Sequence, residues 1–511
     1  MRATRAAVLA VGLALVAGVA RADGERRLTV TEDAPARMVP TDGTGSASGA
    51  ARVAPGAVSN VIYVERCRGG CTLTRGATSD SRTLTSTVPV GPGTTFHLGE
   101  FVSAARASGD AADAEWDQLV TCLREVYSPY AVVVTDVRPA PTSSYHLALV
   151  AGIPDEVGFP RDVLGVAPLS SDCVPLDNAI SFTFANAHGG TNPDQRTRSL
   201  CWTAAQESAH AFGLDHEYEF TDGRSACSDP MTYRADCGGQ KFFRNQGARC
   251  GTVAPADCQC SATQSSHQRL LSVFGAGTDL TPPPTVDVVY PVTPGGDLGA
   301  VVAGVAYSRR GIARVQLLLN GYPWVEQPGA AFGPNGQGSA QYMFDIPAGV
   351  PESLVDVSVR ALEDTGRATE SAALALTKGA PCVTADRCLT GQRCDAGHCL
   401  WDPPHAVPGD ACAFPQACTS GLCTDDAGAT GTGVCRQACR PDDPTTCPAD
   451  AACASTGPLA GYCAPAFTGG GCCDASSGPR RSATPGIPGA VVAAALCGLG
   501  LRTRRRRAKS Y

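Results

Sequence analysis

The sequence predicts a multidomain exported protein with an α+β domain, then an all-β sandwich, then small disulfide-rich modules and a C-terminal membrane segment. The chain has 511 residues, which is too long for one domain, and its 25 cysteines are too many for a reducing compartment. The sequence TPPP at 281–284 is typical of a stiff linker. An apolar run at 487–501 directly precedes a cluster of arginines, as in a membrane segment held by cytoplasmic charge.

The net charge of −7 is spread without long acidic or basic runs before the last ten residues. This distribution gives no reason to propose a nucleic acid as a partner. The composition instead divides the chain into successive segments. These are a signal peptide at 1–22, a leader at 23–59, the α+β domain at 60–275, a linker at 276–284, the β-sandwich at 285–378, disulfide modules at 379–466 and a C-terminal tail at 467–511.

The N-terminus has the features of a signal peptide. Arg2 and Arg5 precede an apolar run, and the sequence Ala-Arg-Ala at 20–22 is a small-x-small cleavage site. The apolar run is too short for a membrane anchor and no stop-transfer pattern follows it. The leader is rich in Gly, Ala, Pro, Ser and Thr, so we expect a flexible or propeptide-like segment.

The α+β domain shows a succession of strand and helix patterns. Residues 61–65 alternate as a strand would, and apolar residues at helical spacing predict a helix at 113–127. Apolar runs predict a buried strand at 131–139 and another strand at 179–187. A last helix is expected at 265–275, where Leu270, Leu271 and Phe274 can pack on the core.

The stretch QESAHAFGLDH, residues 206–216, contains the candidate site. On a helix, Gln206 and His210 lie one turn apart on the same face, with Glu207 beside them where a water-activating carboxylate is expected. Gly213 can end the helix in a left-handed turn. This turn would allow His216 to approach His210.

This stretch resembles the metzincin zinc-peptidase motif HExxHxxGxxH, with Gln206 in place of the first histidine. Met231, fifteen residues after His216 in the sequence SDPMTY, resembles the Met-turn that lies under the metal in this family. The resemblance implies a metzincin-like fold, a zinc ion and a protein or peptide substrate. It also implies that the strand at 179–187 is the sheet edge beside the cleft, where backbone groups can pair with an extended peptide.

The resemblance also implies a role for each matching residue. His210 and His216 match the second and third zinc ligands, and Glu207 matches the general base that takes a proton from the attacking water. Met231 would pack beneath the site. Tyr233 occupies the place from which some metzincins direct a phenol at the metal or at the developing oxyanion.

Gln206 is the departure from the family pattern. An amide oxygen is a poor, uncharged zinc ligand, so Gln206 would complete a weak site unless His188, Asp215 or Glu217 replaces it. Two functions therefore stay open. The protein is either a zinc-dependent endopeptidase or a catalytically degenerate adhesin or scaffold that keeps the fold for binding.

Ten cysteines lie in the α+β domain, and an even number in an exported chain favours disulfides over a thiolate metal site. The alternative is a zinc knuckle made by Cys250, Cys258 and Cys260. The spacing of these three residues does not match the usual pairs of zinc-binding cysteines.

The segment at 285–378 has short alternating apolar runs, and the Asn320-Gly321 pair predicts a hairpin. This pattern is similar to bacterial Ig-like modules. It serves either as a spacer or as a module that holds substrate or polysaccharide. The twelve cysteines between Cys382 and Cys463 predict small disulfide frameworks with little core of their own. Such modules act as stalks or bind a surface or matrix ligand.

The C-terminal tail contains Cys472 and Cys473, the apolar run at 487–501 and the basic stretch at 502–509. This arrangement resembles the sorting tails of myxobacterial surface proteins, in which a cysteine before the apolar segment marks processing and anchoring. A plain membrane anchor is the alternative. Both interpretations predict an exported protein on the cell surface or outer envelope, held there or released from it.

Overall fold

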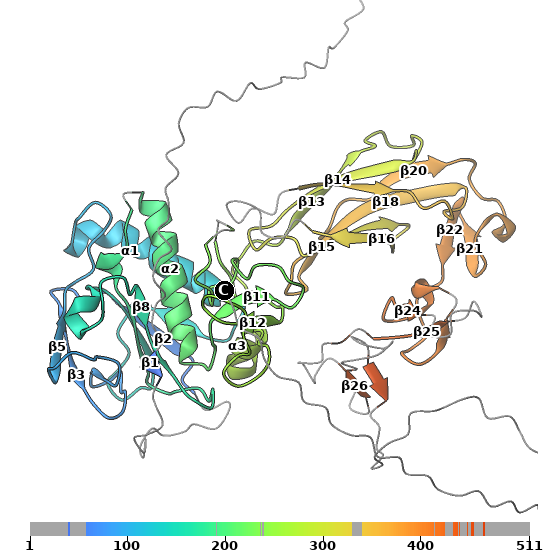
Figure 1. The fold of residues 1–511 in the computed structure, drawn as a ribbon. Coiled ribbons are helices and arrows are strands. Elements are labelled where there is room, and N and C mark those ends of the chain that lie inside the picture. The colour runs from blue at the N-terminus through green and yellow to red at the C-terminus, as the bar shows by residue number, and fades with distance from the viewer. Residues whose placement is uncertain are drawn as a thin grey trace, which may run out of the picture. The chain divides into compact units, whose positions relative to one another are not determined.

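A computed structural model presents the chain as a multidomain, mostly β protein with few helices and many disulfides (Figure 1). The described residues are 39–40, 58–190, 192–235, 237, 240–329, 340–412, 414–424, 433–437, 439, 447, 451–453 and 463–465. The expected signal peptide, most of the leader, and the tail with Cys472 and Cys473 lie outside these residues. The chain divides into two compact units, Met1–Arg436 and Gln437–Tyr511.

A five-stranded sheet forms the centre of the N-terminal region, in the order β6-β2-β7-β10-β8. Its strands are β2 (Val61–Glu65), β6 (Val133–Thr135), β7 (His146–Val150), β8 (Gly165–Val166) and β10 (Ile180–Thr183). Neighbouring strands run parallel except that β8 is antiparallel to β10. The sheet therefore ends in a short antiparallel edge strand.

Two strand predictions need correction. The strand expected at 179–187 as the sheet edge is the inner strand β10, because β8 pairs with its outer side, and residues 185–187 form a 3-10 turn instead. The buried strand expected at 131–139 is limited to β6 at the opposite edge, where Val133 is exposed to solvent. The strand predicted at 61–65 is confirmed as β2.

Three helices accompany the sheet: α1 (Asp113–Tyr127), α2 (Pro193–His210) and α3 (Ser266–Phe274). Helix α1 begins and ends where the apolar spacing predicts, and α3 differs from its prediction by one residue at each end. Helices α1 and α2 pack together against one face of the sheet (Figure 1). Asn192 caps α2 by accepting hydrogen bonds from the backbone of Asp194 and Gln195.

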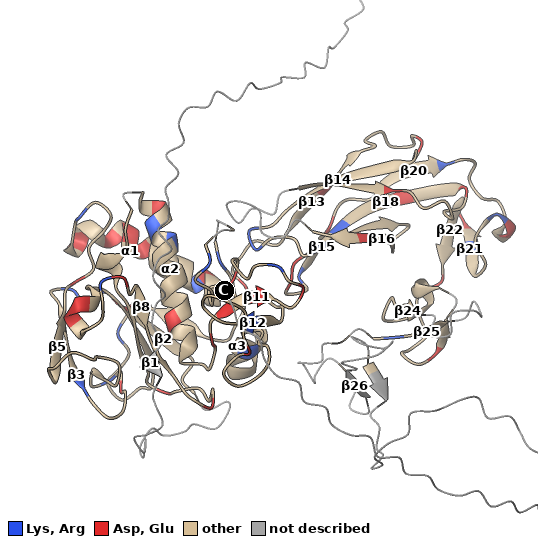
Figure 2. Ribbon diagram, viewed as in Figure 1, with Lys and Arg blue, Asp and Glu red and all other residues tan. Residues whose placement is uncertain are grey.

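Smaller sheets complete this region. The strands β3 (Cys71–Arg75), β4 (Thr85–Ser86) and β5 (Thr95–Leu98) form a three-stranded sheet, and their Leu73, Phe96 and Leu98 join the core on the other face of the central sheet. Two further pairs are β1 (Val39–Pro40) with β9 (Pro168–Leu169), and β11 (Glu217–Phe220) with β12 (Ala248–Cys250). Figure 2 shows both Lys or Arg and Asp or Glu at scattered positions of the described segments.

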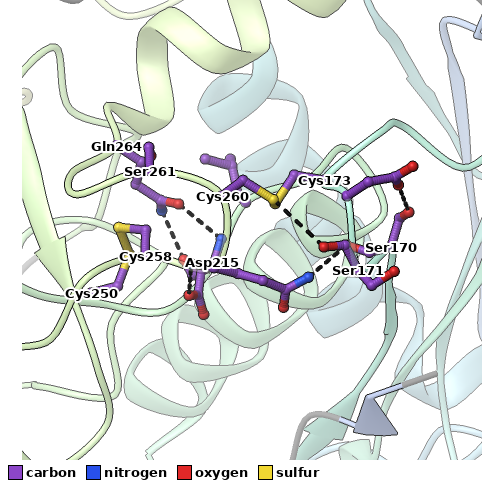
Figure 3. Close-up of a disulfide and its surroundings, with 12 residues drawn as sticks. Ser170, Ser171, Cys173, Asp215, Cys250, Cys258, Cys260, Ser261 and Gln264 are labelled. Carbon is purple, nitrogen blue, oxygen red and sulfur yellow. Dashed lines mark hydrogen bonds between the residues drawn. A yellow bond between two sulfur atoms is a disulfide. The ribbon is translucent and has the colours of Figure 1, made fainter. Parts of the chain in front are cut away.

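All ten cysteines of this region form disulfides. The pairs are Cys67–Cys71, Cys122–Cys201, Cys173–Cys260, Cys227–Cys237 and Cys250–Cys258. Figure 3 shows two of these disulfides, one from Cys258 to Cys250 and one from Cys260 to Cys173. The alternative of a zinc knuckle at these residues is therefore wrong, because their sulfur atoms are bonded to one another.

Thiol labelling without reductant is expected to modify none of these ten cysteines, since a disulfide sulfur cannot be alkylated. Alkylation after reduction under denaturing conditions should then modify all ten, and peptide mapping of the unreduced protein should find the five pairs. Labelling of Cys258 or Cys260 in the unreduced protein would contradict the pairing and restore the thiolate metal site as an alternative.

The segment that follows forms a β-sandwich around its own apolar core. One sheet contains β13 (Thr285–Tyr290), β14 (Val301–Tyr307) and β17 (Ala340–Asp345). The other contains β15 (Arg314–Leu319), β16 (Tyr322–Pro328), β18 (Ser353–Leu362), β19 (Ala368–Glu370) and β20 (Leu374–Lys378). The predicted hairpin joins β15 to β16, with positive φ of 53° at Asn320 and 80° at Gly321.

Loops of the sandwich contact the N-terminal region through two buried arginines. Arg244 is 1% exposed, and its Nη1 donates to the carbonyl of Arg310 at 2.6 Å. Arg310, in the loop after β14, is 0% exposed and donates from Nη2 to the carbonyl of Phe243 at 3.1 Å. The carboxylate of Asp364, in the turn after β18, lies 3.7 Å from Arg244 Nη1 and 3.8 Å from Arg310 Nε. We call Arg244, Arg310 and Asp364 the buried ion cluster.

The disulfide modules repeat one connectivity. In the first, Cys382 pairs with Cys394 and Cys388 with Cys399; in the second, Cys412 pairs with Cys423 and Cys418 with Cys435. Each module thus joins its first cysteine to its third and its second to its fourth. Three of the four sulfur atoms in each module lie within 4.8 Å of one another, but as disulfides they are not free thiolates for a metal.

Strands β21 (Gln392–Asp395) and β22 (His398–Trp401) of the first module extend the sandwich sheet, because β22 pairs with β18. The second module contains β23 (Ala411–Cys412), β24 (Cys423–Thr424) and β25 (Gly433–Cys435). In the second compact unit, β26 (Ala451–Cys453) pairs with β27 (Cys463–Pro465), and Cys447 is bonded to Cys463. No helix among the described residues is long and apolar enough to cross a membrane.

Candidate metal centre

His210 and His216 converge because the chain reverses directly after α2. The helix ends at His210, and Gly213 turns the chain with a φ of 86°. A Cβ at Gly213 would lie 2.1 Å from the carbonyl oxygen of Cys173, so only glycine fits this position. The reversal places the two Nε2 atoms 3.2 Å apart. Two imidazole nitrogens bound at about 2.0–2.1 Å to one tetrahedral zinc ion lie about 3.3 Å apart, so this separation fits shared coordination.

A backbone carbonyl orients the ring of His210, and Asp215 holds the backbone of His216. Nδ1 of His210 donates to the carbonyl of Leu214 at 2.7 Å, which leaves the lone pair of Nε2 directed toward His216. Asp215 accepts hydrogen bonds from the backbone N–H of His216 at 2.7 Å and of Gln259 at 3.0 Å. Burial lowers the pKa of both histidines, and His210 lowers that of His216 further. Both rings are therefore neutral at neutral pH, which is the form that binds a metal.

Gln206 and Glu207 add two buried polar groups on the preceding helical turn. Gln206 is 5% exposed and Glu207 is 2% exposed. Gln206 Nε2 and Glu207 Oε1 have no hydrogen-bond partner among the described residues. A Cβ at Gly165, in edge strand β8, would lie 2.6 Å from Glu207 Cγ and Oε1, so this glycine makes room for the carboxyl group. Burial raises the pKa of Glu207 well above its usual value.

These donors fit a zinc ion incompletely. Unpartnered buried polar atoms are rare in folded proteins, and here they lie beside two neutral imidazoles. Among the described residues, no other His, Cys or carboxylate joins the two histidine nitrogens within 4.8 Å. Rotation of the Gln206 amide exchanges its oxygen and nitrogen, so its oxygen can take the place of Nε2. The residues therefore provide two strong ligands and one weak, uncharged one.

Met231 is fully buried and is bonded through its backbone to Glu217, the residue that follows His216. Its backbone N–H donates to Asp229 Oδ1 at 2.8 Å, and its carbonyl accepts from the backbone N–H of Glu217 at 2.8 Å. Asp229 Oδ2 in turn accepts from the backbone N–H of Arg244 at 2.7 Å. The segment that contains Met231 is thus connected through Asp229 to Arg244 of the buried ion cluster.

The ring of Tyr233 packs on the ring of His216. Their ring centroids are 4.3 Å apart, and the phenol oxygen lies 3.5 Å from His216 Nδ1. Burial raises the pKa of Tyr233, and the nearby Glu207 raises it further. The phenol is therefore neutral and can donate a hydrogen bond.

The three substitute ligands considered for Gln206 do not reach the centre. His188 Nδ1 pairs with Ser199 Oγ at 3.1 Å, and Ser199 precedes Gln206 on α2 by about 10 Å along the helix axis. The Asp215 carboxylate is engaged by backbone N–H groups, as described above. The Glu217 carboxylate accepts a hydrogen bond from Gln264 Nε2 at 3.2 Å.

Lys241 was not predicted as a site residue; it is buried and donates to the backbone carbonyls on both sides of Tyr233. A lone lysine after a Gly-Gly-Gln sequence has no motif or spacing to mark it. Asp229 had a weak signal, since it directly precedes the Pro-Met pair of the predicted Met-turn.

No model of a known protein family matches this chain, and no curated protein does. Among solved structures, fibronectin(III)-like modules of Clostridium thermocellum CbhA match at 20% identity over 19% of this chain and 96% of theirs, with a TM-score of 0.14. A catalytically inactive OgpA from Akkermansia muciniphila, in complex with an O-glycopeptide, matches at 11% identity over 53% of this chain and 89% of its own, with a TM-score of 0.17. A wild-type OgpA structure matches at 11% identity over 62% of this chain and 94% of its own, with a TM-score of 0.17. These similarities are too distant to assign a function, which has to be inferred from the geometry of the site.

Proposed function

We propose that the N-terminal region is a metzincin-like, zinc-dependent endopeptidase. The observation that carries this proposal is the pair of neutral imidazole Nε2 atoms 3.2 Å apart, with Glu207 on the preceding turn of the same helix. His210 and His216 would hold the zinc ion, and the Gln206 amide oxygen would complete the protein ligands. A bound zinc ion would supply Lewis acidity to a peptide carbonyl and to a water molecule.

The chain's own residues would move the protons and orient the substrate. Glu207 would accept a proton from the attacking water and return it to the leaving amine. Tyr233 would donate a hydrogen bond to the oxygen on which charge develops. The short strand β8 lies against Glu207 and is the last strand of the five-stranded sheet among the described residues. An extended peptide paired with β8 would pass beside the carboxylate.

A second function remains in competition, because one observation favours it. Gln206 replaces a ligand that an efficient zinc site requires, and its Nε2 is buried without a described partner. A degenerate adhesin or scaffold would keep the fold and lose the metal. In either case we propose a protein exported to the cell surface, with the tail as its anchor and the Ig-like sandwich and disulfide modules available to a surface or matrix ligand.

Substitution at Gln206 separates the two functions. The purified full-length protein is expected to contain about one zinc ion per chain, and Gln206→His should bind zinc at least about tenfold more tightly, a gain of about 1.4 kcal/mol. Gln206→Leu should bind zinc more weakly than the natural chain, because it removes the amide oxygen. Metal analysis and competition with a chelator would measure these affinities.

Hydrolysis of casein-derived peptides should rise and fall with zinc occupancy in the three proteins. A natural chain that holds no zinc and cleaves no peptide would contradict the peptidase and support the scaffold, even if Gln206→His were active. Equal zinc affinity in the natural chain and in Gln206→Leu would show that the amide is not a ligand.

A further inference from the structure

Lys241 is a buried cation in the segment that follows the Met-turn. Its side chain is 3% exposed, which is unusual for a lysine. Nζ donates to the carbonyl of Thr232 at 2.9 Å and to the carbonyl of Arg234 at 2.7 Å. A buried ammonium group is costly unless its donors are satisfied, so these two bonds account for its position.

The two acceptors are the residues on either side of Tyr233. The chain bends at Tyr233, and the two bonds hold the backbone on both sides of this bend to one ammonium group. The guanidinium of Arg234, the residue after Tyr233, lies 5.3 Å from the ring centroid of Tyr218, so this residue also contacts strand β11. Nζ of Lys241 therefore fixes the backbone from which the Tyr233 phenol reaches His216.

Lys241 also connects this segment to the helix that bears the metal ligands. Its Nζ lies 5.0 Å from the ring centroid of Trp202, which is one helical turn before Gln206 on α2. The position of Tyr233 is thus set relative to α2, and not only within its own loop. The Cys227–Cys237 disulfide already closes that loop, so closing it does not require the lysine.

We propose that Lys241 is a positioning residue that holds the Tyr233 phenol at the centre by binding the carbonyls of Thr232 and Arg234. This inference rests on the proposed peptidase function for its catalytic consequence. Its structural part, the placement of Tyr233, can be tested without hydrolysis.

The kinetic experiment uses the full-length protein with Lys241→Met, which keeps an unbranched side chain over Trp202 and removes the ammonium donors. We expect kcat to fall about tenfold to hundredfold with KM changed less than about twofold, because a displaced phenol loses its bond to the developing oxyanion. Zinc content should not change. In a Tyr233→Phe background, Lys241→Met should alter kcat less than about twofold, since the phenol on which it acts is already absent.

Lys378→Met is the matched control, because Lys378 also donates to a backbone carbonyl, that of Val350, but lies in the sandwich. It should leave kcat and KM unchanged. Lys241→Arg keeps donors in the same place and should recover part of the lost kcat. An equal fall in kcat in both Tyr233 backgrounds, or loss of zinc together with activity, would overturn the proposal and leave Lys241 as a general support of the fold.

A second readout separates this proposal from the peptidase proposal. With 3-fluorotyrosine incorporated at position 233, the ¹⁹F resonance of the otherwise natural chain should be shifted from that of free fluorotyrosine. Because Tyr233 is partly buried, the resonance should also respond less than that of free fluorotyrosine to replacement of water by D₂O. Lys241→Met should move the resonance toward the free value and increase the solvent isotope shift, whereas Lys378→Met should not. An unchanged resonance in Lys241→Met would overturn the placement of Tyr233 by Lys241. If the natural chain hydrolysed no peptide but Lys241→Met still changed the ¹⁹F resonance as expected, the result would contradict the proposed peptidase function and not the placement of Tyr233 by Lys241.

Discussion

Glu207→Gln is expected to lower the kcat of peptide hydrolysis by about 10²–10⁴-fold while the zinc content of the full-length protein stays the same. The amide has nearly the size of the carboxyl group, so it fits the space beside Gly165 that glycine leaves open. It cannot accept the proton of the attacking water. The histidines, which would hold the metal, are not altered by the change.

Glu219→Gln is the matched control for this prediction. Glu219 lies in β11, and its carboxylate makes a long ion pair with Arg249, at 3.6 Å. The same chemical change there should leave kcat and zinc content unaltered. If Glu207→Gln hydrolysed peptide as fast as the natural chain, Glu207 would not be the general base.

Asp364→Asn is expected to lower the free energy of unfolding by about 3–5 kcal/mol, because it removes the charge of the carboxylate that pairs with both buried guanidinium groups. Burial lowers the pKa of Arg244 to about 10 even with Asp364 beside it, which shows how unfavourable this position is for a cation. Urea unfolding followed by tryptophan fluorescence would measure the difference. Glu370→Gln is the control, since the exposed pair of Glu370 with Arg360 is worth at most about 1 kcal/mol.

The pKa of Asp364 also determines how the difference in unfolding free energy between the natural chain and Asp364→Asn depends on pH. Burial acts to raise the pKa of Asp364, but Arg244 and Arg310 lower it, so that the net pKa lies below the usual value of 3.8. A lowered pKa in the folded state contributes stability above the unfolded pKa and loses it as the pH falls through the folded one. The natural chain and Asp364→Asn should therefore converge in stability only below pH 3.8. A difference that is already below about 1 kcal/mol at pH 7 would contradict the importance of the buried ion cluster.

Local patterns predicted a large part of this structure. The apolar spacing of α1 gave both of its ends, and the alternation at Val315, Leu317 and Leu319 gave the inner face of β15. The hairpin at Asn320 and Gly321 and the reversal at Gly213 followed from backbone conformations that these residue types adopt readily. Each of these features depends on residues close together in the sequence.

The structural features that the sequence did not predict depend mostly on contacts between residues that are far apart in the sequence. Strand β8 has only two residues, which is too short for any alternation to appear, so β10 was mistaken for the sheet edge. The partners of Lys241 and Asp364 are fixed by tertiary contacts, and neither side chain has a motif. The disulfide pairs of ten cysteines could not be deduced either, because spacing alone permits many connectivities.

The buried ion cluster has a consequence for how this protein can change over time. Modules joined by a proline-rich linker are commonly exchanged between proteins as separate pieces. Here Arg310 and Asp364 from the sandwich contact Arg244, whose backbone N–H is bonded to the Asp229 carboxylate that also holds Met231. A foreign sandwich without these two residues would leave the buried guanidinium of Arg244 without its ion-pair partner, close to the segment that contains Met231. The two regions are therefore constrained to be inherited together, whereas the second disulfide module, which has its own small core, can be lost or replaced with less effect.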